Sequence, residues 1–107
     1  MFAQNNRLTK SSDIQRIIST GKRHTTPHLR LYWLANSVAR PRLTVVVSKK
    51  TAKFAVTRNR IKRRVRAALK GLTGLPSIDV IVFPKQEAAT LPFTVLEDQL
   101  KKWQDKL

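Results

Sequence analysis

The sequence contains no cysteine, only six acidic residues, and no long apolar run. The absence of cysteine excludes disulfides and thiolate metal sites, and it is compatible with a reducing compartment. No stretch approaches the roughly 20 apolar residues that a membrane span needs. The first ten residues, MFAQNNRLTK, lack the apolar segment of a signal peptide. We therefore expect a protein of the cytoplasm that has no membrane partner.

The shortage of acidic residues is uneven along the chain. The net charge is +16, and the segment between Ile14 and Ile78 holds sixteen Lys or Arg and no acid. Outside this segment, six basic residues balance the six acids. Such a block of like charge disfavours compaction unless a polyanion neutralises it. Nucleic acid is the partner that this charge pattern favours over a merely solvated basic face.

The length of 107 residues and an apolar fraction of 41% fit a single folded domain, residues 1–107. Ser12 and Gln15 have the spacing of a capping box, and Gly21 is a typical stop, which together predict a first helix of about two turns. A second such box, Thr94 and Glu97, opens a helix that runs to the end of the chain.

Alternating apolar residues predict strands over 29–34 and 42–48, and a buried strand over 78–83. Residues 36–41 are a plausible hairpin between the first two strands, and 22–26 form a possible edge strand. Between 48 and 74, an apolar stripe at helical spacing lies opposite an arc of cations, which predicts an amphipathic helix. This order predicts an α+β sandwich with a mixed sheet.

Few residues have the chemistry to cut a bond. The carboxylates are scattered along the chain. His24 and His28 are four apart, but Pro27 lies between them and disfavours the helix that would let both bind zinc. General acid–base cleavage of RNA by these histidines is the alternative, and surface histidines without a catalytic role are the simpler interpretation.

The aromatic residues divide into core and surface candidates. Trp33 and Trp103 lie on apolar stripes and are predicted to be core. Tyr32 alternates onto the other face with Arg30, where it is either a base-stacking residue or a half-buried sheet residue. Phe54 precedes the basic helix as either a helix staple or an exposed platform.

The stretch VVSKKTAKFAVTRNRIKRRVRAAL resembles the signature of the bacterial ribonuclease P protein subunit. The likeness extends over RLTKSSDIQRIISTGK, PHLRLYWL and the C-terminal IDVIVFPKQEAATLPFTVLEDQLKKW, from about Arg7 to Leu107. It implies a two-layer α/β sandwich of order α-β-β-β-α-β-α, with a mixed four-stranded sheet and a left-handed crossover through the basic helix.

The resemblance also implies an activity and its partners. The chain would be the protein subunit of an endoribonuclease whose catalytic RNA, with bound Mg²⁺, removes the 5′ leader from precursor tRNA. The Mg²⁺ would be held mainly by the RNA, with no catalytic or metal-binding residue in the protein. No protein partner is implied. The alternative function is that of a ribosomal-type or RNA-chaperone protein without nuclease activity.

The resemblance assigns two groups of binding residues. The group that contacts the catalytic RNA is Lys49, Lys50, Lys53, Arg58, Asn59, Arg60, Lys62, Arg63, Arg64 and Arg66. Asn59 would read an RNA edge or brace a local turn. The group that lines a cleft for the leader is Ile14, Ile18, Arg30 and Tyr32. Ile14 and Ile18 stand where many family members have Phe, so apolar contact rather than stacking is expected there.

Overall fold

The computed structural model describes residues 11–107, with side chains from Ile14 onward. Its elements are α1 (Ser11–Thr20), β1 (Lys22–Thr25), β2 (Leu29–Ala35), β3 (Arg42–Val45), α2 (Ala55–Lys70), β4 (Ile78–Pro84), the short 3-10 helix η2 (Gln86–Ala89) and α3 (Phe93–Gln104). The order α-β-β-β-α-β-α is confirmed, and so is the edge strand near residue 22. None of the helices in this part of the chain is long and apolar enough to cross a bilayer.

The four strands form one mixed sheet of order β1-β2-β4-β3. β4 pairs antiparallel with β2 and parallel with β3, so it separates the two strands that the sequence pattern joined. The predicted hairpin through residues 36–41 is therefore wrong. Residues 78–82 of β4 are all buried, as expected of a central strand covered on both faces. The left-handedness of the crossover through α2 stays a prediction.

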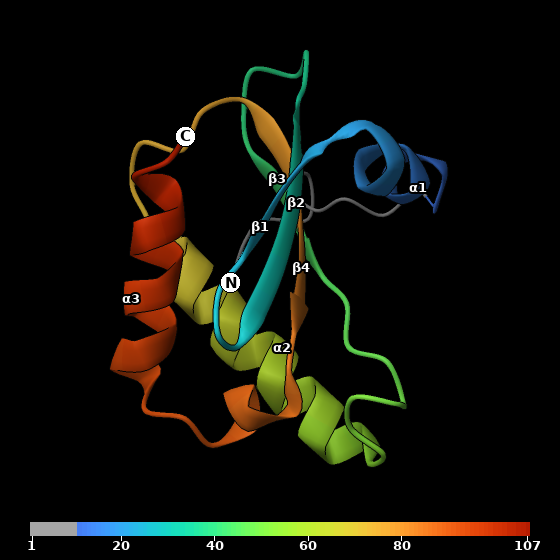
Figure 1. Cartoon of the computed structure of the whole chain (residues 1–107), viewed down its shortest axis with the longest axis vertical. Helices are drawn as coiled ribbons and strands as arrows, with labels where there is room; N and C mark the ends of the chain where they lie inside the picture. Colours follow the sequence, from blue (N-terminus) through green and yellow to red (C-terminus); the bar gives the residue numbers. More distant parts are fainter. Residues whose placement is uncertain (1–10) are drawn as a thin grey trace.

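The two faces of the sheet have separate apolar clusters. Leu29, Leu31 and the buried residues of β3 pack with α2 and α3 on one face. On the other face, Ile17 of α1 packs against Ile81. Figure 1 shows α1 on the opposite side of the sheet from α3. The main sandwich thus consists of the sheet and the layer of α2 and α3, and α1 covers part of the free face.

The tryptophans join the sheet to α3. Trp103 is fully buried, as predicted. Trp33 is half-buried, and its ring meets that of Trp103 edge to face, with the ring centroids 5.7 Å apart.

The apolar stripe predicted for the basic helix is confirmed in α2, which buries Ile61, Val65, Ala68 and Leu69.

The helix ends differ in part from the predicted caps. α1 ends at Thr20, and Gly21 follows it as expected, with its N–H donating to the Ile17 carbonyl at 2.8 Å. The side chain of Ser12 lies outside the described residues, so its cap stays a prediction. The second capping box is wrong, because Pro92 is the N-cap of α3 and no side chain caps this helix.

Candidate nucleic-acid interface

The loop between β3 and α2 is a fixed turn that carries three lysines. The Ser48 carbonyl accepts hydrogen bonds from the N–H groups of Thr51 and Ala52, both at 3.1 Å. Ala52 is buried, whereas Lys49, Lys50 and Lys53 are exposed. The turn therefore holds its backbone against the protein and directs the three ammonium groups into solvent.

Arg58 ties this loop to the first turn of α2. One of its terminal guanidinium nitrogens donates to the carbonyls of Ala52 and Lys53, at 3.0 and 2.9 Å. The Arg58 N–H donates to the Phe54 carbonyl at 3.1 Å. The first arginine of the signature is thus partly a structural residue that sets the direction in which the loop enters the helix.

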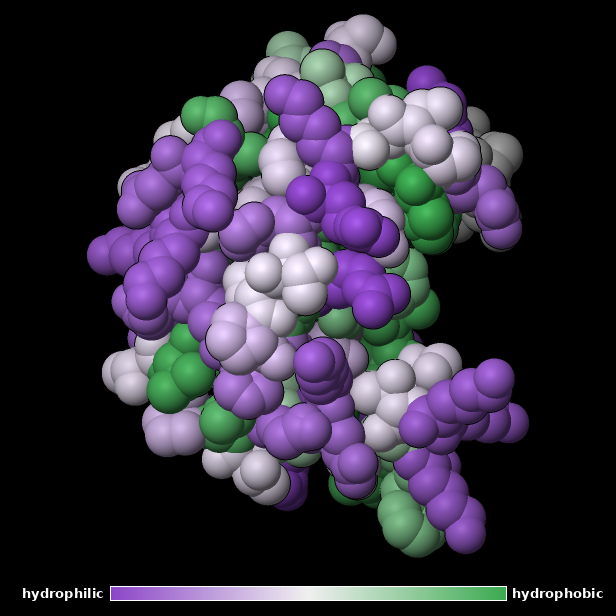
Figure 2. Space-filling model, viewed as in Figure 1, coloured by the Kyte–Doolittle hydropathy of each residue, from purple (hydrophilic) through white to green (hydrophobic). Residues whose placement is uncertain are grey.

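The outer face of α2 is cationic. Asn59, Arg60 and Arg63 are exposed, and Lys62 and Arg66 are partly buried. No acid occurs anywhere in the helix. In Figure 2, long hydrophilic side chains project from the lower right, the corner where Figure 1 places the loop and the start of α2. Loop and helix together form the basic surface, defined by Lys49, Lys50, Lys53, Arg58, Asn59, Arg60, Lys62, Arg63 and Arg66.

Arg64 is turned away from this surface. Its guanidinium donates to the Ala88 carbonyl at 2.6 Å and to the Leu91 carbonyl. These bonds fix α2 to η2 and to the segment before α3. Arg64, predicted from the helical arc to contact RNA, therefore has a role in the fold that the arc did not indicate.

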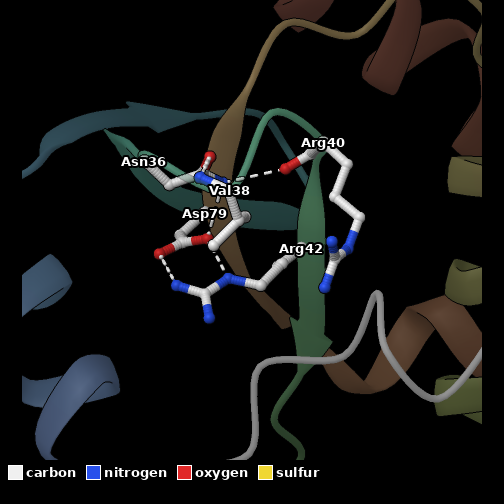
Figure 3. Close-up of polar contacts among 5 residues, drawn as sticks. All are labelled: Asn36, Val38, Arg40, Arg42 and Asp79. Carbon is white, nitrogen blue, oxygen red and sulfur yellow. Dashed lines mark hydrogen bonds and ion pairs between the residues drawn. The ribbon is translucent and has the colours of Figure 1, made fainter.

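Arg42 is a third cation of the acid-free block that the fold itself uses, after Arg58 and Arg64. It forms a two-pronged ion pair with buried Asp79, with Nε and a terminal nitrogen 2.8 and 2.7 Å from the two carboxylate oxygens. Asn36 donates to the same carboxylate at 2.9 Å and to the Arg40 carbonyl at 3.0 Å (Figure 3). The network joins β3, β4 and the loop 36–41. It was missed in the sequence, although a lone acid inside an apolar strand was a signal for it.

The open part of the α1 face of the sheet holds the second predicted group. Tyr32 is half-buried, and its ring meets Phe83 edge to face at 5.7 Å. Ile14 is partly buried beside it, Ile18 is 39% exposed, and Arg30 is exposed. All four predicted cleft residues are thus brought to one side of the sheet.

Phe83 and Arg23 also belong to this face and were not predicted. Phe83 lies opposite Arg30 in the sheet register, and Arg23 lies opposite Tyr32. Directly paired residues point to the same face, so two arginines and two aromatic rings share it. Phe83 follows Asp79 and Ile81 at intervals of two residues, so the three share one face of the strand. This signal was overlooked because the strand was assumed to be buried along its whole length.

A groove of about 430 Å³ lies at the end of β4, beside the β3–α2 loop. Arg30 and Phe83 line it on the sheet side and Thr51 on the loop side, and Glu87 of η2 also borders it.

His24 and His28 line one pocket together with Asp98, Gln99 and Lys102 of α3. That they are surface histidines without a catalytic role stays a prediction. His28 lies in the turn between β1 and β2, where Gln99 Nε2 is 2.9 Å from its Nδ1. The Gln99 carbonyl oxygen also accepts from the Thr26 hydroxyl at 2.5 Å. This network fixes the turn on α3. Among the side chains described from Ile14 onward, no three of His, Cys, Asp or Glu gather in a way that could hold a metal ion.

Comparison with known proteins gives consistent results. The family model for Ribonuclease P matches residues 2–107. The ribonuclease P protein component of Marinobacter nauticus is 38% identical over 79% of this chain and 65% of its own length. The component from Pseudanabaena sp. is 34% identical over 94% of this chain and 90% of its own. The structure of the Staphylococcus aureus RNase P protein superposes with a TM-score of 0.79 at 30% identity, covering 91% of this chain and 90% of that one. The chain therefore belongs to the ribonuclease P protein family.

Proposed function

We propose that this chain is the protein subunit of a ribonuclease P holoenzyme and assists its catalytic RNA in removing the 5′ leader of precursor tRNA. The observation that carries this proposal is the basic surface, which is built on a fixed turn and a docked helix and has no acid within it. The protein contributes binding and positioning, and the RNA subunit carries the chemistry.

The basic surface is suited to the phosphates of the RNA subunit. Arg60 and Arg63 are exposed on the helix, and a guanidinium fork can hold a phosphate through two hydrogen bonds. Lys49 and Lys50 add point charges at the tip of the turn. The start of α2 has no side-chain cap, so its first backbone N–H groups can also donate to an anion.

The α1 face of the sheet is suited to a single-stranded leader. Tyr32 and Phe83 supply aromatic surface, and Arg23 and Arg30 supply charge on either side. Single-stranded RNA is commonly held by this combination of stacking and backbone charge. Because mature tRNA lacks the leader, contacts made only here favour precursor over product.

The Mg²⁺ that the resemblance implies does not fit a site in the described part of this chain. Mg²⁺ requires several oxygen ligands. The buried carboxylate of Asp79 is engaged by Arg42 and Asn36, and no cluster of potential ligands occurs among the side chains of residues 14–107. We assign the Mg²⁺ to the RNA subunit and no step of the reaction to a metal held by the protein.

Reconstitution tests the proposal. The full chain is added to ribonuclease P RNA at an Mg²⁺ concentration too low for the RNA to cleave alone, and 5′ processing of a precursor tRNA is followed. Cleavage at the mature 5′ end is expected only when both components are present. Cleavage by the protein alone would contradict the assignment of the chemistry to RNA. Binding without any gain in cleavage would favour a ribosomal-type or chaperone role.

A further inference from the structure

A large aromatic side chain stands exposed within the basic surface. Phe54, the N-cap of α2, is 66% exposed. It does not act as a staple against the core, because such a contact would bury the ring. The Lys53 ammonium lies 5.8 Å from the centroid of the ring. The ring is therefore available to a partner, with a cation beside it.

The backbone that carries this ring is held on both sides. Arg58 binds the carbonyls of Ala52 and Lys53, immediately before Phe54, and its own N–H binds the Phe54 carbonyl. Ala52 is 2% exposed and anchors the loop. A partner that contacts the ring would thus lose little free energy in ordering the segment beneath it.

The charges around Phe54 specify the partner. Residues 49–66 contain Lys and Arg but no Asp or Glu. A ligand for this region must bring negative charge together with a flat apolar face. A nucleotide whose base is not paired has both, since every base has a face on which an aromatic ring can stack.

We propose that Phe54 is a stacking platform for an unpaired base of the RNA subunit, whose neighbouring phosphates contact Lys49, Lys50 and Lys53. This inference rests on the proposed function and adds a base contact to a surface otherwise described by charge. Stacking of one base typically changes affinity by about five- to 150-fold.

The experiment compares variants of the full chain for binding to ribonuclease P RNA. Phe54→Ala removes the ring, Phe54→Leu keeps apolar volume without a flat face, and Phe54→Trp enlarges the face. Phe93→Ala is the matched control, because Phe93 is also exposed at the start of a helix but lies on α3, which carries Glu97 and Asp98. The dissociation constant is measured over a series of salt concentrations, and circular dichroism follows folding.

Phe54→Ala and Phe54→Leu should weaken binding at least fivefold, while Phe54→Trp and Phe93→Ala should bind like the wild type. The salt dependence should be the same for all variants, because no charge is removed. Wild-type affinity in Phe54→Ala, or in Phe54→Leu, would overturn the platform and leave the proposed function standing. A wild-type protein that does not prefer ribonuclease P RNA over an unrelated folded RNA would overturn both, and would favour a ribosomal-type or chaperone role.

Discussion

At the scale of single residues, Gly21 shows how tightly the first helix meets the sheet. A Cβ atom at this position would lie 2.5 Å from the carbonyl oxygens of both Ile17 and Trp33. Backbone atoms on both sides leave no flexible group to move aside. Gly21→Ala should therefore destabilise the protein by about 1–3 kcal/mol, the usual cost of overpacking.

Urea unfolding measures this effect, and Gly71→Ala is its control. Gly71 has helical backbone angles, and the nearest atom to an added Cβ is 3.4 Å away. Its replacement should be neutral or stabilise by up to about 1 kcal/mol. Equal unfolding midpoints for the two variants would show that α1 can move away from β2 without loss.

Substitutions at Tyr32 can distinguish a role in the fold from a role in contacting substrate. It packs beside Phe83 and Ile81, so Tyr32→Leu, which fills much of the space, is a better probe than removal of the side chain. Holoenzyme affinity for a precursor tRNA should fall about fivefold or more, since one stacked base is lost. Affinity for mature tRNA should not change.

The measurement uses holoenzyme and tRNA with and without a leader of about five nucleotides, and Tyr32→Phe serves as the conservative control. Tyr32→Phe should bind both RNAs like the wild type. Equal losses on the two RNAs in Tyr32→Leu would assign Tyr32 to the fold and remove it from the leader contact.

Residue roles were predictable where one local rule decided them. Trp103 and Ile61 lie on apolar stripes and are buried as expected. Arg64 and Asp79 were not predictable in this way, because their partners are distant in sequence: the carbonyls of Ala88 and Leu91 for one, and Arg42 for the other. The position of a residue on a helix predicts the direction in which its side chain leaves the backbone. It does not predict whether a long, flexible arginine side chain turns back to bond the protein.

At the scale of elements, the junction between the β3–α2 loop and α2 depends on the shape of one guanidinium. Arg58→Lys keeps the charge, but the lysine nitrogen lies one bond nearer the backbone than the terminal nitrogen that serves the Ala52 and Lys53 carbonyls, and its flexible stem does not hold it there. The loop should become more mobile, and affinity for the RNA subunit should fall several-fold. The slope of affinity against salt should stay unchanged.

Backbone amide hydrogen exchange of residues 49–54, measured with RNA affinity, checks this prediction. Arg63→Lys is the control, because Arg63 is an exposed member of the same helix and should keep the exchange rates of this loop. If Arg58→Lys lost affinity with unaltered exchange, Arg58 would be a direct contact and not an organiser of the loop.

The order of strands in the sheet could not be predicted from the periodicity of the individual strands. Periods of two and 3.6 residues located β2, β4 and α2, and they located the start of β3, which ends at Val45 and not at residue 48 as predicted. The pairing of β2 with β3 across 36–41 was wrong. Neighbouring strands in sequence usually pair, but the run Val80–Val82, buried on both faces, fits only the centre of the sheet. Sequence periodicity therefore shows where a strand lies along the chain. Whether both faces of the strand are buried shows whether it lies at the centre or at the edge of the sheet.

At the scale of the whole molecule, charge is separated between regions. The acid-free block includes the loop and α2, whereas Glu97 and Asp98 lie on α3. This separation is visible in the sequence, and it is enough to predict a nucleic-acid partner. The sequence does not show that Arg42, Arg58 and Arg64 are partly used within the protein, so the charge available to RNA is smaller than the count suggests.

We propose that the basic surface holds the RNA subunit through phosphate charge. The most direct test is the salt dependence of binding to ribonuclease P RNA for Arg60→Gln/Arg63→Gln, with Lys101→Gln/Lys102→Gln on α3 as the control of equal charge. If the slope per duplex phosphate applies, the first pair should flatten the logarithmic plot by up to about 1.8, and the control should leave it unchanged. An unchanged slope for Arg60→Gln/Arg63→Gln, or an equal change for both pairs, would show that phosphate contacts of the basic surface do not hold the RNA subunit.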